Sequence, residues 1–347
     1  MRSPRGCGLL LGVLVAADAA AGSLCLPQGS SGKVYLSDQQ GIIFYQKPRE
    51  QIVLRVDYEI RDPAAPITKL GWIIPVPGKP DLTSTASSEV FPELNDFTVA
   101  VFADESKEPP ARGGELPEQT PRTQPAIEAL KGSGKGAALA ANQWLQRHGL
   151  QVIRPDEMSY YAQHSWCFVA VLFEDAQGLP PRGRLGPVRL SFAAQRIYYP
   201  LLLCADEGVF DFTLYIFSKG SIDRSELNKF GLTLAELEAP GMKQTNRITR
   251  VRDLPDQTRR LFDLVAHDEP AISKLERGRI FLYRTCARGL NDDDHPIAKW
   301  DTDLELSAPV GSPLSPYINI MVGIAAVLTV FAVARTRQRI ARDRARS

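Results

Sequence analysis

The sequence predicts an α+β fold, in which an extracytoplasmic body with a largely antiparallel sheet and a few helices precedes a single C-terminal transmembrane helix. Three observations lead to this fold class. Apolar residues recur at every second position early in the chain and again in its middle, as in half-buried strands. Segments typical of helices lie between and after these strands. The regular alternation of strands with long helices that a doubly wound parallel sheet requires is missing.

The first part of the body, 22–103, is rich in predicted strands. Residues 51–60 alternate between apolar and charged side chains, which indicates a strand with one buried face. A strand over 70–74 ends at Pro75, because proline cannot donate a hydrogen bond to a neighbouring strand. Shorter strands are predicted over 42–45 and 97–102.

Residues 104–125 have a different composition. They contain five prolines, many charges and almost no large apolar residue. Such a segment cannot bury enough apolar surface to offset the entropy lost on ordering. We therefore predict a disordered, Pro-rich insertion at 104–125.

The remainder of the body, 126–316, mixes helices and strands. A helix is expected from Ala137 to His148, with Gly149 as its C-terminal cap, and Thr233 and Glu236 have the spacing of a capping box. Further helices are predicted over 257–266 and 270–277, and strands over 166–173, 188–192, 197–203, 210–217, 279–285 and 304–306.

The N-terminal residues 1–21 have the layout of a secretory signal peptide. Arg2 and Arg5 precede a short apolar run that ends at small residues. The run is shorter than the roughly 20 residues that a membrane span needs. A buried N-terminal helix is the alternative, but such a helix should carry polar positions on its outer face.

Residues 317–334 contain no charged side chain and form the predicted transmembrane helix. The tail, 335–347, carries six arginines and one aspartate, and basic residues collect on the cytoplasmic side of a span. The predicted protein is therefore a single-pass membrane protein with a cytoplasmic C-terminus. Its body would lie in the periplasm or at the cell surface, and its membrane partner is the lipid bilayer.

The charge of the body excludes one class of partner. Between the two ends, residues 22–316 have 33 basic and 38 acidic side chains, a net charge of −5. Nucleic-acid binding needs a basic surface, so no nucleic-acid partner is expected.

Four cysteines remain after the signal peptide: Cys25, Cys167, Cys204 and Cys286. In an exported chain they permit two disulfides in three connectivities, and a buried, unpaired thiol at Cys167 is the alternative. No CxxC spacing occurs, so neither a zinc site nor a thiol-redox motif is predicted.

Two segments resemble ligand-binding motifs without meeting their requirements. The glycine-rich stretch 131–136 lacks the GxxxxGK[ST] pattern of a phosphate loop and is interpreted as a flexible lead into the following helix. The acidic stretch Asn291–His295, with Asp301 and Asp303 downstream, suits Ca²⁺ in composition but lacks the EF-hand glycine and glutamate. No metal site and no cofactor are predicted.

The nearest approach to a catalytic group is His164-Ser165-Trp166-Cys167. Neighbouring strand residues point to opposite faces, so His164 and Ser165 are not expected to pair. The sequence contains neither HExxH nor GxSxG. The catalytic residues, if there are any, stay unknown, and Tyr160, Tyr161 and Trp166 are interpreted as core or rim aromatics.

Three segments together resemble a bacterial family catalogued as a domain of unknown function. They are the Gly-Trp-x-x-Pro-x-Pro stretch at 71–77 and the runs 160–170 and 185–201. The resemblance covers most of Lys33–Leu306 outside the insertion. It implies an exported, membrane-anchored protein, and it brings no activity, substrate or catalytic residue.

Trp72 with Pro75 and Pro77 is interpreted as an edge strand that enters a rigid loop, with a binding rim as the alternative.

These observations favour a non-enzymatic envelope module that binds or scaffolds an unidentified protein or ligand. The alternative is an extracytoplasmic hydrolase without a recognisable motif. A pocket that brings a nucleophile or an acidic cluster together, near Cys167 or at Asp292–His295, would distinguish the two.

Overall fold

The computed structural model describes residues 24–99, 124–204, 208–230, 232–234, 247–290, 297 and 302–309. The predicted signal peptide, most of the predicted insertion, the predicted span and the tail fall outside these ranges. Among the helices that are described, none combines the length and the apolar character that crossing a membrane requires.

A large sheet forms the centre of the protein, with the strand order β11-β13-β10-β2-β3-β8-β5, and β12 also pairs with β13. All pairs in it are antiparallel except the β2–β10 pair, which is parallel. The predicted, largely antiparallel sheet is thus confirmed. Its strands are β2 (Lys33–Gln46), β3 (Arg49–Arg61), β5 (Pro80–Thr85), β8 (Arg182–Ala193), β10 (Phe210–Ser218), β11 (Thr233–Leu234), β12 (Arg247–Thr249) and β13 (Ile280–Leu290).

Two smaller sheets complete the β structure. The first has the order β1-β4-β7-β6, and the second joins β14 to β9. Their strands are β1 (Leu24–Cys25), β4 (Lys69–Val76), β6 (Ala126–Ala129), β7 (Cys167–Glu174), β9 (Ile197–Tyr199) and β14 (Leu304–Leu306).

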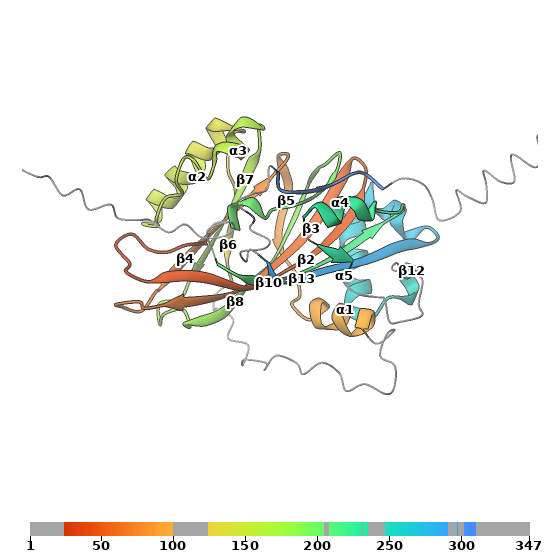
Figure 1. Cartoon of the computed structure of the whole chain (residues 1–347), viewed down its shortest axis with the longest axis horizontal. Coiled ribbons are helices and arrows are strands. Elements are labelled where there is room, and N and C mark those ends of the chain that lie inside the picture. The colour runs from red at the N-terminus through yellow and green to blue at the C-terminus, as the bar shows by residue number, and fades with distance from the viewer. Residues whose placement is uncertain are drawn as a thin grey trace, which may run out of the picture.

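Four of the described helices lie in two groups at opposite ends of the molecule, with α2 and α3 beside the four-stranded sheet and α1 and α5 beside the large sheet, while α4 lies apart and contacts β11 (Figure 1). The described helices are α1 (Val90–Val99), α2 (Lys135–Arg147), α3 (Ser159–Gln163), α4 (Arg224–Lys229) and α5 (Asp256–Asp268), with the 3-10 helices η1 (Leu202–Cys204), η2 (Val251–Asp253) and η3 (Ile272–Glu276).

Each face of the large sheet contributes to a separate hydrophobic core. On β3, Ile52 and Leu54 belong to the core shared with the four-stranded sheet, whereas Val53 belongs to the core under α1 and α5. Successive strand residues point to opposite faces, so β3 is buried on both sides. The result is a layered body. Its layers are, in order, the helices α1 and α5, the large sheet, the four-stranded sheet and the helix α2.

The predicted polar face of residues 51–60 is covered in part by α1. Arg55 is 5% exposed, its guanidinium lies 4.4 Å from the centroid of the Phe91 ring, and it donates to the carbonyl oxygen of Ser88. The alternation therefore predicted the strand correctly, while a helix from elsewhere in the sequence covers the face that carries the charges.

Three local predictions are wrong in whole or in part. The strand predicted over 197–203 ends at Tyr199, and Leu202–Cys204 form η1. Residues 97–99 belong to α1, whose buried Val90, Leu94 and Thr98 recur at the spacing of one helical face. Thr233 starts no helix but lies in β11, opposite Cys286 of β13. At 97–99 a short apolar run fitted both a strand and a helix. At Thr233 the capping-box spacing occurs in a segment that pairs with the edge of the large sheet.

The Trp-Pro-Pro stretch ends a strand, as predicted, but this strand is an edge strand only in part, because β4 lies between β1 and β7 at Gly71 and Trp72. Trp72 lies in the middle of β4 and is 1% exposed. β1 pairs only with Gly71 and Trp72, so in the described chain no strand borders that edge of β4 at Pro75. Proline is tolerated at such a position because no neighbour there needs its missing N–H.

Candidate functional site

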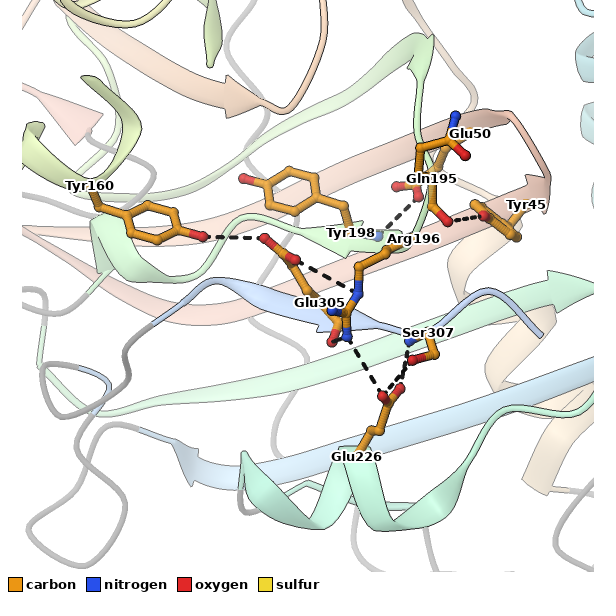
Figure 2. A network of polar contacts seen from close by, with 9 residues as sticks. All are labelled: Tyr45, Glu50, Tyr160, Gln195, Arg196, Tyr198, Glu226, Glu305 and Ser307. Atoms are coloured by element: carbon orange, nitrogen blue, oxygen red, sulfur yellow. Dashed lines mark hydrogen bonds and ion pairs between the residues drawn. The ribbon is translucent and has the colours of Figure 1, made fainter. Parts of the chain in front are cut away.

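The last described segment, 302–309, is built into the body (Figure 2) and precedes the predicted span in the sequence. Its strand β14 pairs with β9, with Leu304 opposite Tyr199 and Leu306 opposite Ile197. Both leucines are at most 1% exposed. We call the polar contacts around this strand the C-terminal junction; its residues are Tyr160, Arg196, Tyr198, Glu226, Asp303, Glu305 and Ser307.

Asp303 is the innermost residue of the junction and is 0% exposed. One carboxylate oxygen accepts the backbone N–H groups of Leu201 at 2.7 Å and Leu202 at 2.6 Å, and the other accepts the Tyr198 hydroxyl at 3.0 Å. Burial raises the pKa of Asp303 to about 6, although the two N–H donors oppose the shift. Asp303 therefore fixes the chain between Tyr198 and Leu202 against the C-terminal segment.

Glu226 and Glu305 form the outer part of the junction (Figure 2). Glu226 of α4 accepts the Ser307 N–H at 2.5 Å and the Ser307 hydroxyl at 2.6 Å, and Glu305 accepts the Tyr160 hydroxyl at 3.2 Å. Arg196 lies 3.6 Å from Glu226 and 3.8 Å from Glu305. Because Arg196 is half exposed, its ion pairs add little stability, and the hydrogen bonds define the geometry.

Glu50 also binds the chain at Tyr198, and its side chain is 0% exposed. One of its carboxyl oxygens accepts the Tyr198 N–H at 2.9 Å, while the other has no hydrogen-bond partner in the described residues. Burial raises the pKa of Glu50 well above its usual range. Nearby, the Tyr45 hydroxyl donates to the Gln195 carbonyl oxygen at 2.9 Å (Figure 2).

The Glu50→Gln variant is expected to be more stable than the unchanged protein at pH 8. Because the folded-state pKa is raised, the stability that a protonated Glu50 provides is complete below pH 4.5 and is lost as pH rises toward that pKa. Glutamine keeps the acceptor and cannot ionise. The Tm difference between variant and unchanged protein should grow by at least about 2 °C between pH 4.5 and pH 8. Thermal melts would contradict this if the difference were constant, and exposed Glu276→Gln is the matched control.

The predicted nucleophile candidates are not assembled into a catalytic site. His164 directs Nδ1 to the Tyr160 carbonyl oxygen at 2.7 Å, and its ring lies 4.4 Å from the Tyr160 ring at an interplanar angle of 35°. Ser165 occupies a turn with φ of 59°, and burial raises the pKa of the Cys167 thiol, which opposes formation of a reactive thiolate. Tyr161 and Trp166 are buried, which agrees with their interpretation as core aromatics.

The metal candidates are only partly within the described ranges. Residues 291–296 and Asp301 lie outside them, and the described Asp303 is occupied by the contacts above. In the described chain no group of three or more His, Cys, Asp or Glu side chains is placed to hold a metal ion. Among the described residues, no disulfide joins Cys25, Cys167, Cys204 and Cys286 to one another.

The glycine-rich stretch 131–136 lies between the short strand β6 and the start of α2. Gly134 has φ of 55°, and a Cβ there would lie 2.8 Å from the Ala162 carbonyl oxygen. Its N–H donates to the Trp166 carbonyl oxygen at 2.8 Å. Glycine is thus needed for close packing against the turn after α3, which supports the rejection of a phosphate loop.

A groove of about 490 Å³ lies between β6 and α2. Glu128 accepts the Trp144 indole N–H at 3.0 Å at this place, and Leu130 lies beneath the surface with 7% exposure. The groove is lined by Glu128, Leu130, Lys131, Ala140, Gln143, Gln146 and Arg147.

Sequence reasoning predicted neither the junction nor the groove. The junction brings together residues more than 100 positions apart, such as Tyr160 and Glu305, and no local pattern marks that contact. A signal for the groove existed: from Leu130 to Gln151 the chain has three basic residues and no acidic one, in a body that is acidic overall.

Comparison with solved structures shows only distant likeness. A crystal structure of baculovirus P35 has a TM-score of 0.39 and 8% identity, covering 62% of this chain and 75% of that one. A crystal structure of the caspase-8/P35 complex has a TM-score of 0.33 and 7% identity, and the match covers 61% of this chain and 73% of that one. Likeness at this level supports no conclusion about fold or function. No curated protein matches the chain.

A bacterial family matches residues 15–272, which is most of the chain, while β13 and β14 lie beyond the match. This agrees with the resemblance noted from the sequence, although whether the Gly-Trp-x-x-Pro-x-Pro stretch is typical of the family is not tested by the match. The chain belongs to the family described as uncharacterized protein conserved in bacteria, DUF2330.

Proposed function

We propose that this protein is a membrane-anchored extracytoplasmic module that binds or scaffolds an envelope protein or ligand and has no enzymatic activity. Residues 1–21 direct export, residues 317–334 anchor the chain in the bilayer, and the C-terminus is cytoplasmic. The acidic body, with a net charge of −5, argues against a nucleic-acid partner.

The C-terminal junction is the observation that carries this proposal. Asp303, Glu305 and Ser307 hold the end of the body to β9, α3 and α4. From Pro309 to Tyr317 the chain covers at most about 28 Å even when fully extended. A body fastened this close to its anchor presents a fixed part of its surface at a limited height above the membrane, as a scaffold or binding module requires.

The polar groups nearest to catalytic chemistry serve structural contacts, which favours binding over hydrolysis. His164 bonds a backbone carbonyl, and Asp303 accepts backbone and hydroxyl donors. A hydrolase would need a nucleophile and a base within hydrogen-bond reach of each other. No observation in the described residues favours the hydrolase alternative over the binding module.

Membrane fractionation tests the anchor. The full chain is expected to stay in the membrane pellet after carbonate extraction, whereas a chain ending at Pro316 should be exported and soluble. In spheroplasts, added protease should degrade the body. Release of the full chain by carbonate, or protection of the body from protease, would contradict the proposal.

Site-specific photo-crosslinking in cells tests the binding role. A photoreactive residue at Gln143, on exposed α2, is expected to give a discrete adduct. The same residue at Arg260, which is exposed on α5 at the other end of the body, is the matched control. Equal adduct patterns at both positions, or none at Gln143, would count against a binding role for this face.

A further inference from the structure

We propose that the groove between β6 and α2 binds an acidic, extended peptide segment of another protein, whose carboxylates pair with Lys131 and Arg147. This inference rests on the proposed binding role and assigns that role a site and a class of ligand. Three independent observations support it: unused hydrogen-bond donors, local charge and shape.

The donors that line the groove are available to a ligand. Lys131, Gln143, Gln146 and Arg147 are exposed, and in the described chain none of their side chains makes a hydrogen bond or an ion pair. Arg189, on the other face of the large sheet, is by contrast paired with Asp268 at 2.6 Å. Side-chain amides bind peptide backbone groups, and cations bind carboxylates.

The lining of the groove holds two cations, Lys131 and Arg147, and one carboxylate, Glu128, whereas the body as a whole is acidic. Lys131, Lys135 and Arg147 lie between Leu130 and Gln151, where no acidic residue occurs. The one carboxylate in the lining, Glu128, already accepts the Trp144 indole N–H. An excess of cations in this groove of an acidic protein attracts anionic ligands to it.

The shape of the groove favours a peptide chain over a membrane surface. Its volume of about 490 Å³ lies within the range of ligand-binding clefts, roughly 300–1,000 Å³. Leu130 and Ala140 provide apolar lining, and Leu139, which is 60% exposed, shares a helix face with Gln143 and Gln146. An extended chain can enter such a groove and place alternate side chains on the cations and on the apolar surface, whereas a flat bilayer cannot.

Fluorescence anisotropy with the full chain in uncharged detergent micelles tests the proposal. The probe is a fluorescein-labelled decapeptide of alternating alanine and glutamate, and its glutamine counterpart is the uncharged comparison. The test variant is Lys131→Glu with Arg147→Glu. The matched control is Arg260→Glu with Lys274→Glu, which reverses two exposed charges on α5 and η3. Circular dichroism melts establish that both variants fold.

We expect saturable binding of the glutamate peptide that weakens at least tenfold in the groove variant and by less than twofold in the control. The glutamine peptide should bind at least tenfold more weakly, and added salt should weaken binding of the glutamate peptide. Absence of saturable binding by the unchanged chain, or an equal loss in both variants, would overturn the proposal. Groove-dependent binding of short-chain phosphatidylglycerol without binding of the peptide would also overturn it, in favour of a lipid headgroup.

The failures of the two proposals can be told apart. If the peptide does not bind, the proposed groove is refuted. The fractionation result, and with it the proposal of a membrane-anchored module, is not affected. Release of the full chain by carbonate would refute the anchor and leave the anisotropy result standing.

Discussion

Replacing Asp303 with alanine is expected to lower the free energy of unfolding by about 3–5 kcal/mol. The substitution leaves the N–H groups of Leu201 and Leu202 without their acceptor, while the Tyr198 hydroxyl keeps the Pro75 carbonyl oxygen at 3.1 Å. Each unsatisfied buried donor costs about 1–3 kcal/mol. Urea denaturation followed by far-UV circular dichroism measures the change, and a loss below about 1 kcal/mol would contradict the role assigned to this carboxylate.

Asp303→Asn separates the acceptor role of this residue from its charge. The pKa of Asp303 is raised from 3.8 to about 6, so the stability that its protonation provides is present below pH 3.8 and is lost as pH rises through about 6. The shift corresponds to about 3 kcal/mol. Asparagine keeps an acceptor oxygen and does not titrate, so the unchanged protein should lose up to about 3 kcal/mol relative to the variant between pH 4 and pH 7. Parallel stability profiles would refute this.

Replacing Trp72 with alanine is expected to cost about 3–5 kcal/mol, as for other large-to-small substitutions of buried aromatics. Trp72 is 1% exposed in the middle of β4, between Leu24 of β1 and Val171 of β7. Its removal leaves a cavity in the core that joins the two sheets. The urea midpoint should fall while the denaturant slope stays unchanged, which is the sign of lost stability without a change in the surface exposed on unfolding.

Two controls make the Trp72 prediction specific. Trp72→Phe keeps most of the ring volume and should lose roughly half as much stability as Trp72→Ala. Lys69→Ala removes an exposed ion pair with Glu174 at the start of the same strand and should cost less than about 1 kcal/mol. Equal losses for Trp72→Ala and Lys69→Ala would mean that Trp72 does not anchor the strand.

The local pattern of side chains determined most of the individual elements. Alternation over 51–60 predicted β3, and the predicted helix over 257–266 lies within α5, where Leu261, Phe262 and Val265 are buried on one face. Gly149, which follows α2 with φ of 68°, was predicted as its cap. These features could be read from the sequence because each depends on residues within a few positions of one another.

The tertiary structure decided which elements meet. The parallel neighbour of β2 is β10, more than 170 residues later in the chain, and nothing in either strand's sequence identifies the other as its partner. The same holds for the C-terminal junction, where Asp303 accepts donors from residues about 100 positions earlier. Such contacts form because distant segments bury their apolar faces together, and the polar groups then pair with whatever lies beside them.

The sequence by itself therefore determined the membership of a bacterial family, the α+β class and the kinds of element, and it supports the prediction of an exported and anchored chain. Only the tertiary structure decided that Asp303 accepts backbone N–H groups and the Tyr198 hydroxyl, and that the glycine-rich stretch serves close packing. It also decided that Lys131 and Arg147 line one groove. The physical reason is that the role of a polar side chain depends on its burial and on its neighbours in space, and both are set by contacts between segments far apart in the chain.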